Sequence, residues 1–127
     1  MATCRVFRQT GSSAAHCEVA VRISKSGESS SPRTVIEVDH VDHANLWKVS
    51  FVRGVSSGVA AASRLGIDTR GLVVTVEKFI GQMADTPDDL AEACTHVAVL
   101  RTLVVGTKAS PEFDEKTGLW RVAPDSK

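Results

Sequence analysis

The chain has 127 residues, of which 43% are hydrophobic and 24% charged, and this is typical of one globular domain with a hydrophobic core of its own. Its 15 basic and 15 acidic residues balance, so no overall field favours nucleic acid, an anionic membrane or an acidic partner. Aromatic residues make up only 5% of the chain, which argues against a base-stacking platform.

The three cysteines, Cys4, Cys17 and Cys94, are odd in number and widely spaced. They predict neither a disulfide framework nor a zinc motif. The first residues lack the apolar core of a signal peptide, and no apolar run approaches ~20 residues. We therefore expect a soluble, cytoplasmic protein that makes no membrane contact.

The first half of the sequence predicts β-strands. Residues 4–8 alternate briefly between apolar and polar side chains, and residues 17–23 alternate more clearly. The serine-rich residues 24–33 predict a hairpin loop, and the β-branched residues 34–39 predict the strand that returns beside residues 17–23.

Residues 46–52 are interpreted as a further strand, because Trp47, Val49 and Phe51 alternate with polar residues. Together with the preceding segments they predict an antiparallel meander of three or four strands.

Helical spacing begins at Val55. The apolar residues Val55, Val59, Ala62 and Leu65 share one face, and Gly66 lies where a glycine would end the helix. Because this face is made of small side chains, we expect the helix to lie close to its sheet.

A strand and a second helix follow. Residues 72–80 contain a β-branched run that predicts a strand covered on part of both faces. Asp85 or Thr86 is the expected N-cap of the helix, Pro87 fits its first position, and Gly106 is expected to close it.

The end of the sequence turns polar. Residues 112–122 contain two short apolar stretches around a Lys-Thr-Gly turn, which predicts a β-hairpin. In this hairpin Phe113 and Trp120 would pack on the body of the protein or on a partner.

The fold class that these elements predict is α+β, in a single domain. Residues 1–105 would form a mainly antiparallel sheet of four to five strands with two helices packed on one face. Residues 106–127 would form a C-terminal extension that contains the hairpin and ends in disorder.

The β-β-β-α-β-α order, the small-residue helix and the Asp-Thr-Pro-Asp-Asp start of the second helix resemble domain IV of translation elongation factor G and its relatives. They also resemble the amino-terminal half of the small-molecule kinases named for galactose, homoserine, mevalonate and phosphomevalonate. In those kinases a Gly-Leu-x-Ser-Ser-Ala loop opens a helix over nucleotide phosphates, and residues 54–60, Gly-Val-Ser-Ser-Gly-Val-Ala, are loosely similar to it. The resemblance covers residues 35–105 and implies the fold, while function does not follow from fold.

Arg53, Gly54, Ser56 and Ser57 form the first candidate site. A helix N-terminus exposes free backbone N–H groups, and two hydroxyls and a guanidinium would complete a site for an anionic, phosphorylated metabolite. The competing interpretation, which we favour, is that the serines cap the helix and that Gly54 and Gly58 allow close packing.

Four residues of one polar segment form the second candidate site: Asp39, His40, Asp42 and His43. They offer metal ligands, or a base with an orienting carboxylate. Because neighbouring residues of an extended chain face opposite sides, a metal would need a further ligand such as Glu77 or His96. No zinc spacing supports this site, and the interpretation we favour is a polar turn that leads into a strand, in which the aspartates accept local backbone N–H bonds. We therefore expect no metal and no other cofactor.

Two cysteine–histidine pairs fail as catalytic pairs. Cys94 and His96 are two residues apart on a helix and point roughly 200° apart. His16 and Cys17 are adjacent on a strand and face opposite sides. Cys94 is expected to be an inert core thiol, and His96 a solvent-facing or interface residue.

Two functions are consistent with these patterns. We favour a non-enzymatic module that self-associates, as a homodimer, or binds a protein partner through its sheet face, an edge strand or the hairpin. The alternative is a small enzyme or ligand-binding protein that holds an anionic metabolite at residues 54–58, with His40 or His43 for acid–base or metal chemistry. Neither function calls for nucleic acid or a membrane.

Overall fold

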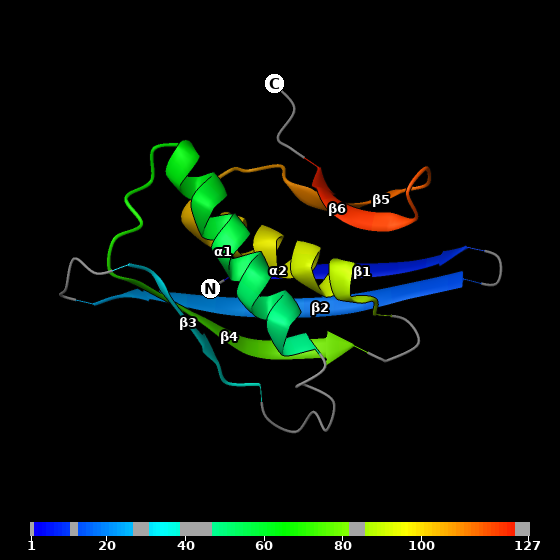
Figure 1. The fold of residues 1–127 in the computed structure, drawn as a ribbon, viewed down its shortest axis with the longest axis horizontal. Helices are drawn as coiled ribbons and strands as arrows, with labels where there is room; N and C mark the ends of the chain where they lie inside the picture. The colour runs from blue at the N-terminus through cyan, green and yellow to red at the C-terminus, as the bar shows by residue number, and fades with distance from the viewer. Residues whose placement is uncertain (1, 11–12, 27–30, 39–46, 82–85, 124–127) are drawn as a thin grey trace.

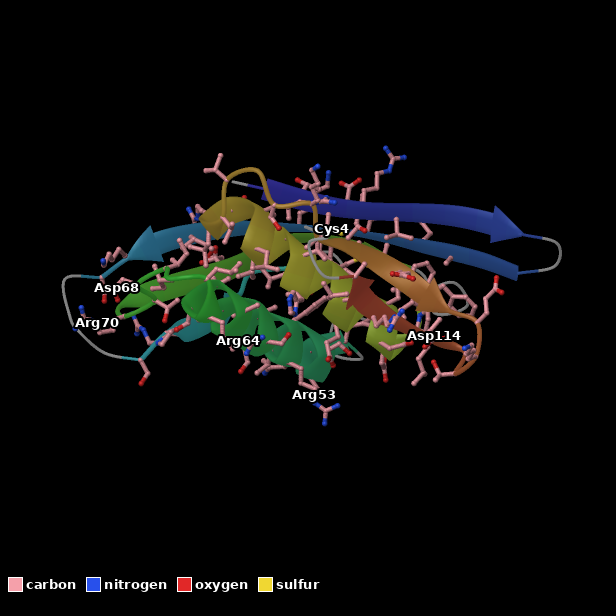
Figure 2. All side chains as sticks on the ribbon, turned by 90° about the horizontal axis from the view of Figure 1, so that it is seen from above. Cys4, Arg53, Arg64, Asp68, Arg70 and Asp114 are labelled. Carbon is pink, nitrogen blue, oxygen red and sulfur yellow. The ribbon has the colours of Figure 1, made fainter. Side chains whose placement is uncertain are left out.

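The structure is a computed structural model, and it describes residues 2–10, 13–26, 31–38, 47–81 and 86–123. Its elements in chain order are β1 (Ala2–Thr10), β2 (Ser13–Lys25), β3 (Arg33–Ile36), α1 (Lys48–Arg64), β4 (Leu72–Gly81), α2 (Asp88–Leu103), β5 (Ser110–Asp114) and β6 (Leu119–Ala123). Both helices lie on one face of the sheet formed by the first four strands (Figure 1), and the hairpin of β5 and β6 lies on the same side (Figure 2). The predicted α+β class is confirmed. No helix in the described ranges is both long and apolar enough to cross a bilayer.

The strand β4 lies inside the sheet rather than at its edge. The strand order is β1-β2-β4-β3, with β1 and β4 antiparallel to β2 and with β3 parallel to β4. The prediction that residues 34–39 return beside residues 17–23 is therefore wrong, because β4 occupies that position. A parallel pair needs a crossover connection, and α1 supplies it between β3 and β4.

The first turn of α1 replaces the strand that the sequence predicted over residues 46–52, so that prediction is wrong. Trp47 and Phe51 are only 3% and 0% exposed. A strand would also place them on one face. Residues four apart are about one turn apart in a helix and two full repeats apart in a strand, so they share a face in both structures. Val49 distinguishes the two structures: a strand would bury it with Trp47, whereas on α1 it is 62% exposed.

The end of α1 follows the prediction. Gly66 has a positive φ of 92°, and its N–H donates to the Ser63 carbonyl at 3.0 Å. The N–H of Ile67 donates to the Ala62 carbonyl at 3.1 Å. These two bonds form a Schellman motif, in which glycine at the left-handed position ends the helix.

The start of α2 differs from the prediction. Pro87 is the N-cap residue, and it offers no side-chain hydrogen bond to the helix. Thr86, one of the two expected caps, donates its hydroxyl to the His16 carbonyl instead, and Asp85 lies outside the described residues. The helix also ends at Leu103, before the expected Gly106.

The two helices approach each other closely along two glycines of α1. A Cβ placed on Gly54 would lie 2.6 Å from the Glu92 carbonyl oxygen, and one on Gly58 would lie 2.9 Å from the His96 carbonyl oxygen. The small residues of α1 therefore allow close packing against α2, where the sequence had predicted close packing against the sheet.

The outer face of the sheet, opposite the helices, is covered by a network of ion pairs. Glu18 on β2 is within 3.7 Å of Arg5 on β1 and within 2.7 Å of Lys78 on β4. Arg22 on β2 lies 3.7 Å from Glu77 on β4 and 3.4 Å from Glu37 after β3. Three basic and three acidic side chains therefore form ion pairs that run across the sheet, from Arg5 on the edge strand β1 to Glu37 after β3.

The hairpin of β5 and β6 packs on α2, as the sequence allowed. The rings of Phe113 and Trp120 lie 5.5 Å apart between centroids. Trp120 and Val122 are partly buried against the main core, and the backbone N–H of Trp120 donates to the carboxylate of Asp89 at the start of α2. Disorder was predicted for the last five residues, 123–127. Ala123 is instead the final residue of β6, and residues 124–127 lie outside the described part of the chain.

Candidate functional site

The first predicted site lies inside α1, not at its start. Arg53, Gly54, Ser56 and Ser57 follow Lys48, the first helical residue, by more than one turn. The helix start predicted near Val55 is therefore wrong. Only the first four N–H groups of a helix are free, so the backbone donors on which the anion site depended are already used within α1. Anion binding by these side chains stays a prediction.

The second predicted site, with His40, Asp42 and His43, lies outside the described residues, as does Asp39. Of the two distant ligands considered for it, Glu77 pairs with Arg22 on the outer sheet face. In the described ranges, no three His, Cys, Asp or Glu side chains are grouped so that they could hold a metal ion.

The structure instead brings Ser57 and His96 together across the two helices. Ser57 Oγ lies 2.8 Å from His96 Nδ1, although the residues are 39 positions apart. Ser57 Oγ also lies 3.2 Å from the Gly54 carbonyl oxygen and can donate to it. A hydroxyl has one hydrogen, so there are two arrangements. In one, Ser57 donates to Gly54 and accepts from His96 Nδ1–H; in the other, it donates to an unprotonated Nδ1.

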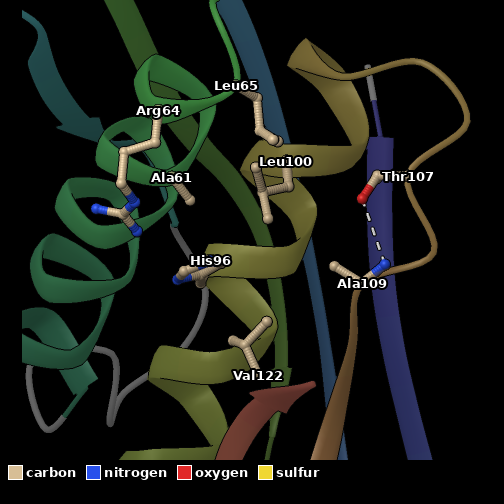
Figure 3. A pocket seen from close by; sticks show the side chains of 8 residues that line it. All are labelled: Ala61, Arg64, Leu65, His96, Leu100, Thr107, Ala109 and Val122. Atoms are coloured by element: carbon tan, nitrogen blue, oxygen red, sulfur yellow. Dashed lines mark hydrogen bonds between the residues drawn. The ribbon is translucent and has the colours of Figure 1, made fainter. Parts of the chain in front are cut away.

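His96 also lines a cavity of about 370 Å³ between α1, α2 and β6 (Figure 3). The remaining lining residues come from the end of α1, from α2, and from the segment that leads into and through the hairpin: Ala61, Arg64, Leu65, Leu100, Thr107, Ala109 and Val122. Most of these side chains are apolar. Among the described residues that line the cavity, Arg64 is the one with a fixed charge, and none carries a carboxylate.

Arg64 and His96 form the polar side of this cavity. In Figure 3 the Arg64 side chain extends from α1 toward the His96 ring. Burial lowers the pKa of His96 below its ordinary value, and the nearby Arg64 guanidinium lowers it further. His96 is therefore neutral at pH 7, and the positive charge of the cavity comes from Arg64.

Ser57 is placed to orient His96 rather than to react. Its hydroxyl has two partners, Gly54 and His96, and the residue is not part of the cavity lining. A hydrogen bond at Nδ1 fixes the ring orientation and leaves Nε2 for another group. The arrangement therefore suits binding in the cavity, where a ligand meets one cation and one imidazole.

The outward side of α1 forms a second notable surface. Lys48, Val49, Val52 and Arg53 are exposed there, and we call these four residues the basic face of α1. The helix contains no acidic residue. Within the described part of the chain, neither Lys48 nor Arg53 has an ion-pair partner. Figure 2 shows Arg53 pointing away from the body of the protein.

The three cysteines meet in the core, which their wide spacing in the sequence did not indicate. Cys4 on β1, Cys17 on β2 and Cys94 on α2 are all fully buried and free. A hydrogen bond to Cys94 and burial raise the pKa of Cys4, and a hydrogen bond to Cys17 raises that of Cys94. The thiols of Cys4 and Cys94 therefore stay protonated, and Cys94 is a core thiol, as expected.

Sequence reasoning missed the pairing of Ser57 with His96 and the cavity beside it. One signal was available: Gly54 and Gly58 are four residues apart on one side of a helix, a spacing that allows another helix to approach closely. Ser57 is three residues after Gly54, a spacing that places it on the same side of the helix, so it faces the same partner. The sequence does not say which helix that partner is, or which of its residues would meet Ser57.

Comparisons with known proteins bear on the fold. No protein-family model matches the sequence. No curated protein matches it either. Among solved structures, the fold is similar to part of a protein from Thermus thermophilus, with a TM-score of 0.50 and 12% sequence identity. The match covers 77% of this chain and 14% of that protein. At this identity the likeness concerns the fold alone, and the resemblance to elongation factor G and the small-molecule kinases stays a prediction.

Proposed function

We propose that this protein is a non-enzymatic binding module that docks an acidic protein segment on the basic face of α1. The observation that carries the proposal is the uneven distribution of paired charges. Arg5, Arg22 and Lys78 on the sheet are held by acidic neighbours, whereas Lys48 and Arg53 have no such neighbour among the described residues. A chain that is neutral overall therefore presents a locally basic helix.

The apolar part of the same face supports a protein partner rather than a small ion. Val49 and Val52 are 62% and 43% exposed, and they lie three residues apart on the helix surface between the two basic side chains. Residues at this spacing are neighbours on a helix. An acidic segment with an apolar stripe would cover the valines and pair its carboxylates with Lys48 and Arg53.

The test is a titration of the protein with a labelled amphipathic peptide of leucine and glutamate, followed by fluorescence anisotropy. The double variant Lys48→Gln/Arg53→Gln should weaken binding by about tenfold at low salt, because two charge pairs are lost. Lys25→Gln/Arg33→Gln is the matched control, since it removes two exposed charges from the strands β2 and β3. Equal weakening by both doubles would contradict the proposal.

Self-association through the sheet is the second form of partner binding to consider. The strand β1 lies at the edge of the sheet, and an exposed edge is a template for pairing with another chain. Arg101 Nη1 on α2 already donates to the Thr3 carbonyl of β1 at 3.1 Å, which satisfies one acceptor of that strand. Sedimentation velocity tests the predicted homodimer directly: a dimer that Thr3→Pro dissociates supports pairing through β1, and a monomer across the concentration range excludes it.

A further inference from the structure

We propose that the cavity between α1, α2 and β6 binds a small aliphatic monocarboxylate, with its carboxylate at Arg64 and its tail between the helices and the hairpin. This site is separate from the basic face of α1, and the proposal does not depend on the function proposed above. Its support comes from the size of the cavity, its lining and its charge.

The shape and lining of the cavity suit a short aliphatic chain. Its volume of about 370 Å³ lies within the range of ordinary small-molecule sites. Leu100 and Ala109 are 5% and 3% exposed, and together with the partly buried Val122 they form an apolar floor. Ala61 adds only a methyl group from α1, which leaves room for a ligand. The second, smaller hydrophobic cluster of the protein therefore borders this space.

The charge of the cavity selects an anion. Arg64 is a permanent cation, no acidic side chain of the described residues lines the space, and Arg64 has no ion-pair partner in the same ranges. A guanidinium binds a carboxylate through two parallel hydrogen bonds, which fixes the orientation of the ligand. A single carboxylate matches the single fixed charge, whereas a doubly charged phosphate would be only half neutralised.

His96 gives the second polar contact, and Ser57 is a positioning residue for it. When Ser57 donates to His96 Nδ1, the proton of the neutral ring lies on Nε2, which can then donate to the carboxylate. When Ser57 donates to Gly54 instead, Nε2 is unprotonated and would repel the carboxylate. Ligand binding therefore selects the arrangement in which Ser57 donates to His96 Nδ1.

Binding should also be linked to the protonation of His96. Of the described groups that face the ring from α1, α2, the hairpin and the segment before it, Arg64 is the one with a charge, and it disfavours the imidazolium. A bound carboxylate offsets that charge and raises the pKa of His96. By reciprocity, the carboxylate binds more tightly as the pH falls toward the range in which His96 takes up a proton.

The experiment compares octanoate with octanamide, its neutral analogue, in an NMR titration of the full chain. We expect saturable shifts at Ala61, Leu100 and Val122 with octanoate, a rise in the pKa of His96, and binding of octanamide that is weaker by about three- to tenfold. Arg64→Gln should weaken the binding of octanoate by a similar factor, so that octanoate and octanamide then bind equally well. Ala61→Leu, which fills the cavity, should weaken both ligands.

The matched control is Arg53→Gln, which removes the same charge from the same helix outside the cavity. It should leave octanoate binding unchanged. Equal affinity for octanoate and octanamide, equal weakening by Arg53→Gln and Arg64→Gln, or shifts that miss the cavity residues would each overturn the proposal. Because Lys48 and Arg53 are not part of this site, failure here would leave the proposed docking of an acidic segment standing, and the reverse also holds.

Discussion

Gly54 of α1 and Thr95 of α2 are in such close contact that a Cβ on Gly54 would lie 2.6 Å from the Thr95 Cβ. Real Cβ atoms do not approach so closely, so either the helices would have to separate or the Thr95 side chain would have to move. Thr95 is fully buried, and its hydroxyl donates to the Ala91 carbonyl at 2.8 Å. The contact is therefore rigid on both sides.

Gly54→Ala should destabilise the protein although alanine is the better helix former. Intrinsic propensity favours the alanine by about 1 kcal/mol. Overpacking of a tight contact costs about 1–3 kcal/mol, and here the nearest atoms include the Glu92 carbonyl oxygen of the backbone. The difference between the two is a net loss of up to about 2 kcal/mol in the free energy of unfolding, measured by urea denaturation.

The matched control for this variant is Ser56→Ala, at an exposed position two residues further along α1. This substitution also raises helix propensity, but it does not touch the contact with α2. The variant should therefore be as stable as the wild type or slightly more stable. An increase in stability for Gly54→Ala would show that the helices can separate at no cost.

Val49→Ala tests the corrected secondary structure at the start of α1. Val49 is 62% exposed on the helix, and alanine is the better helix former, so the variant should be more stable by a few tenths of a kcal/mol, about 0.5. On the strand that the sequence predicted, Val49 would face the core, and the same change would cost about 2 kcal/mol. Val55→Ala, at a 2% exposed position of the same helix, is the control and should lose about 2–3 kcal/mol.

The neutral state of His96 should make stability depend on pH. Burial and then Arg64 lower its pKa below the ordinary value of 6.5, so the unfolded chain takes up a proton before the folded protein does. The contribution of neutral His96 to the free energy of unfolding is therefore fully present above pH 6.5, and it is lost as the pH falls below that value. His96→Gln should show a smaller fall in unfolding free energy between pH 7 and pH 5 than the wild type does. Identical pH profiles of the two proteins would refute this assignment.

The buried cysteines should not react in the folded protein. The thiolate is the nucleophile, and the raised pKa values of Cys4 and Cys94 keep both thiols protonated. We expect no labelling by a disulfide reagent such as DTNB at pH 8, and full labelling in urea. Ser56→Cys supplies an exposed reference thiol on α1, which should react at once. A fast phase in the wild type would show that the core opens more readily than its packing suggests.

The elements that sequence reasoning located are those whose patterns admit one interpretation. The run at residues 72–80 became β4 (Leu72–Gly81), and the alternation at residues 17–23 became the middle of β2. Gly66 was identified as the end of α1 because a left-handed residue after a helix favours glycine. In each case the signal is local, so one sequence was enough.

The predictions were wrong where the local sequence pattern fits more than one structure. Trp47 and Phe51 are four apart, so they share a face both in a helix and in a strand, and the β-branched Val49 between them favoured the wrong choice. Strand order depends on which segments bury the most surface together, and no single segment carries that information. The contact of Ser57 with His96 likewise depends on two helices that meet only in the folded chain.

The position of β4 in the sheet also constrains how the chain can assemble. β1 and β2 are consecutive and can pair as soon as both exist, but among the described strands β3 has only β4 as a neighbour. During synthesis β3 must therefore wait, unpaired, while the whole of α1 is made. The sheet can therefore be completed only after β4 has been made, because β4 is the strand that joins β3 to β2.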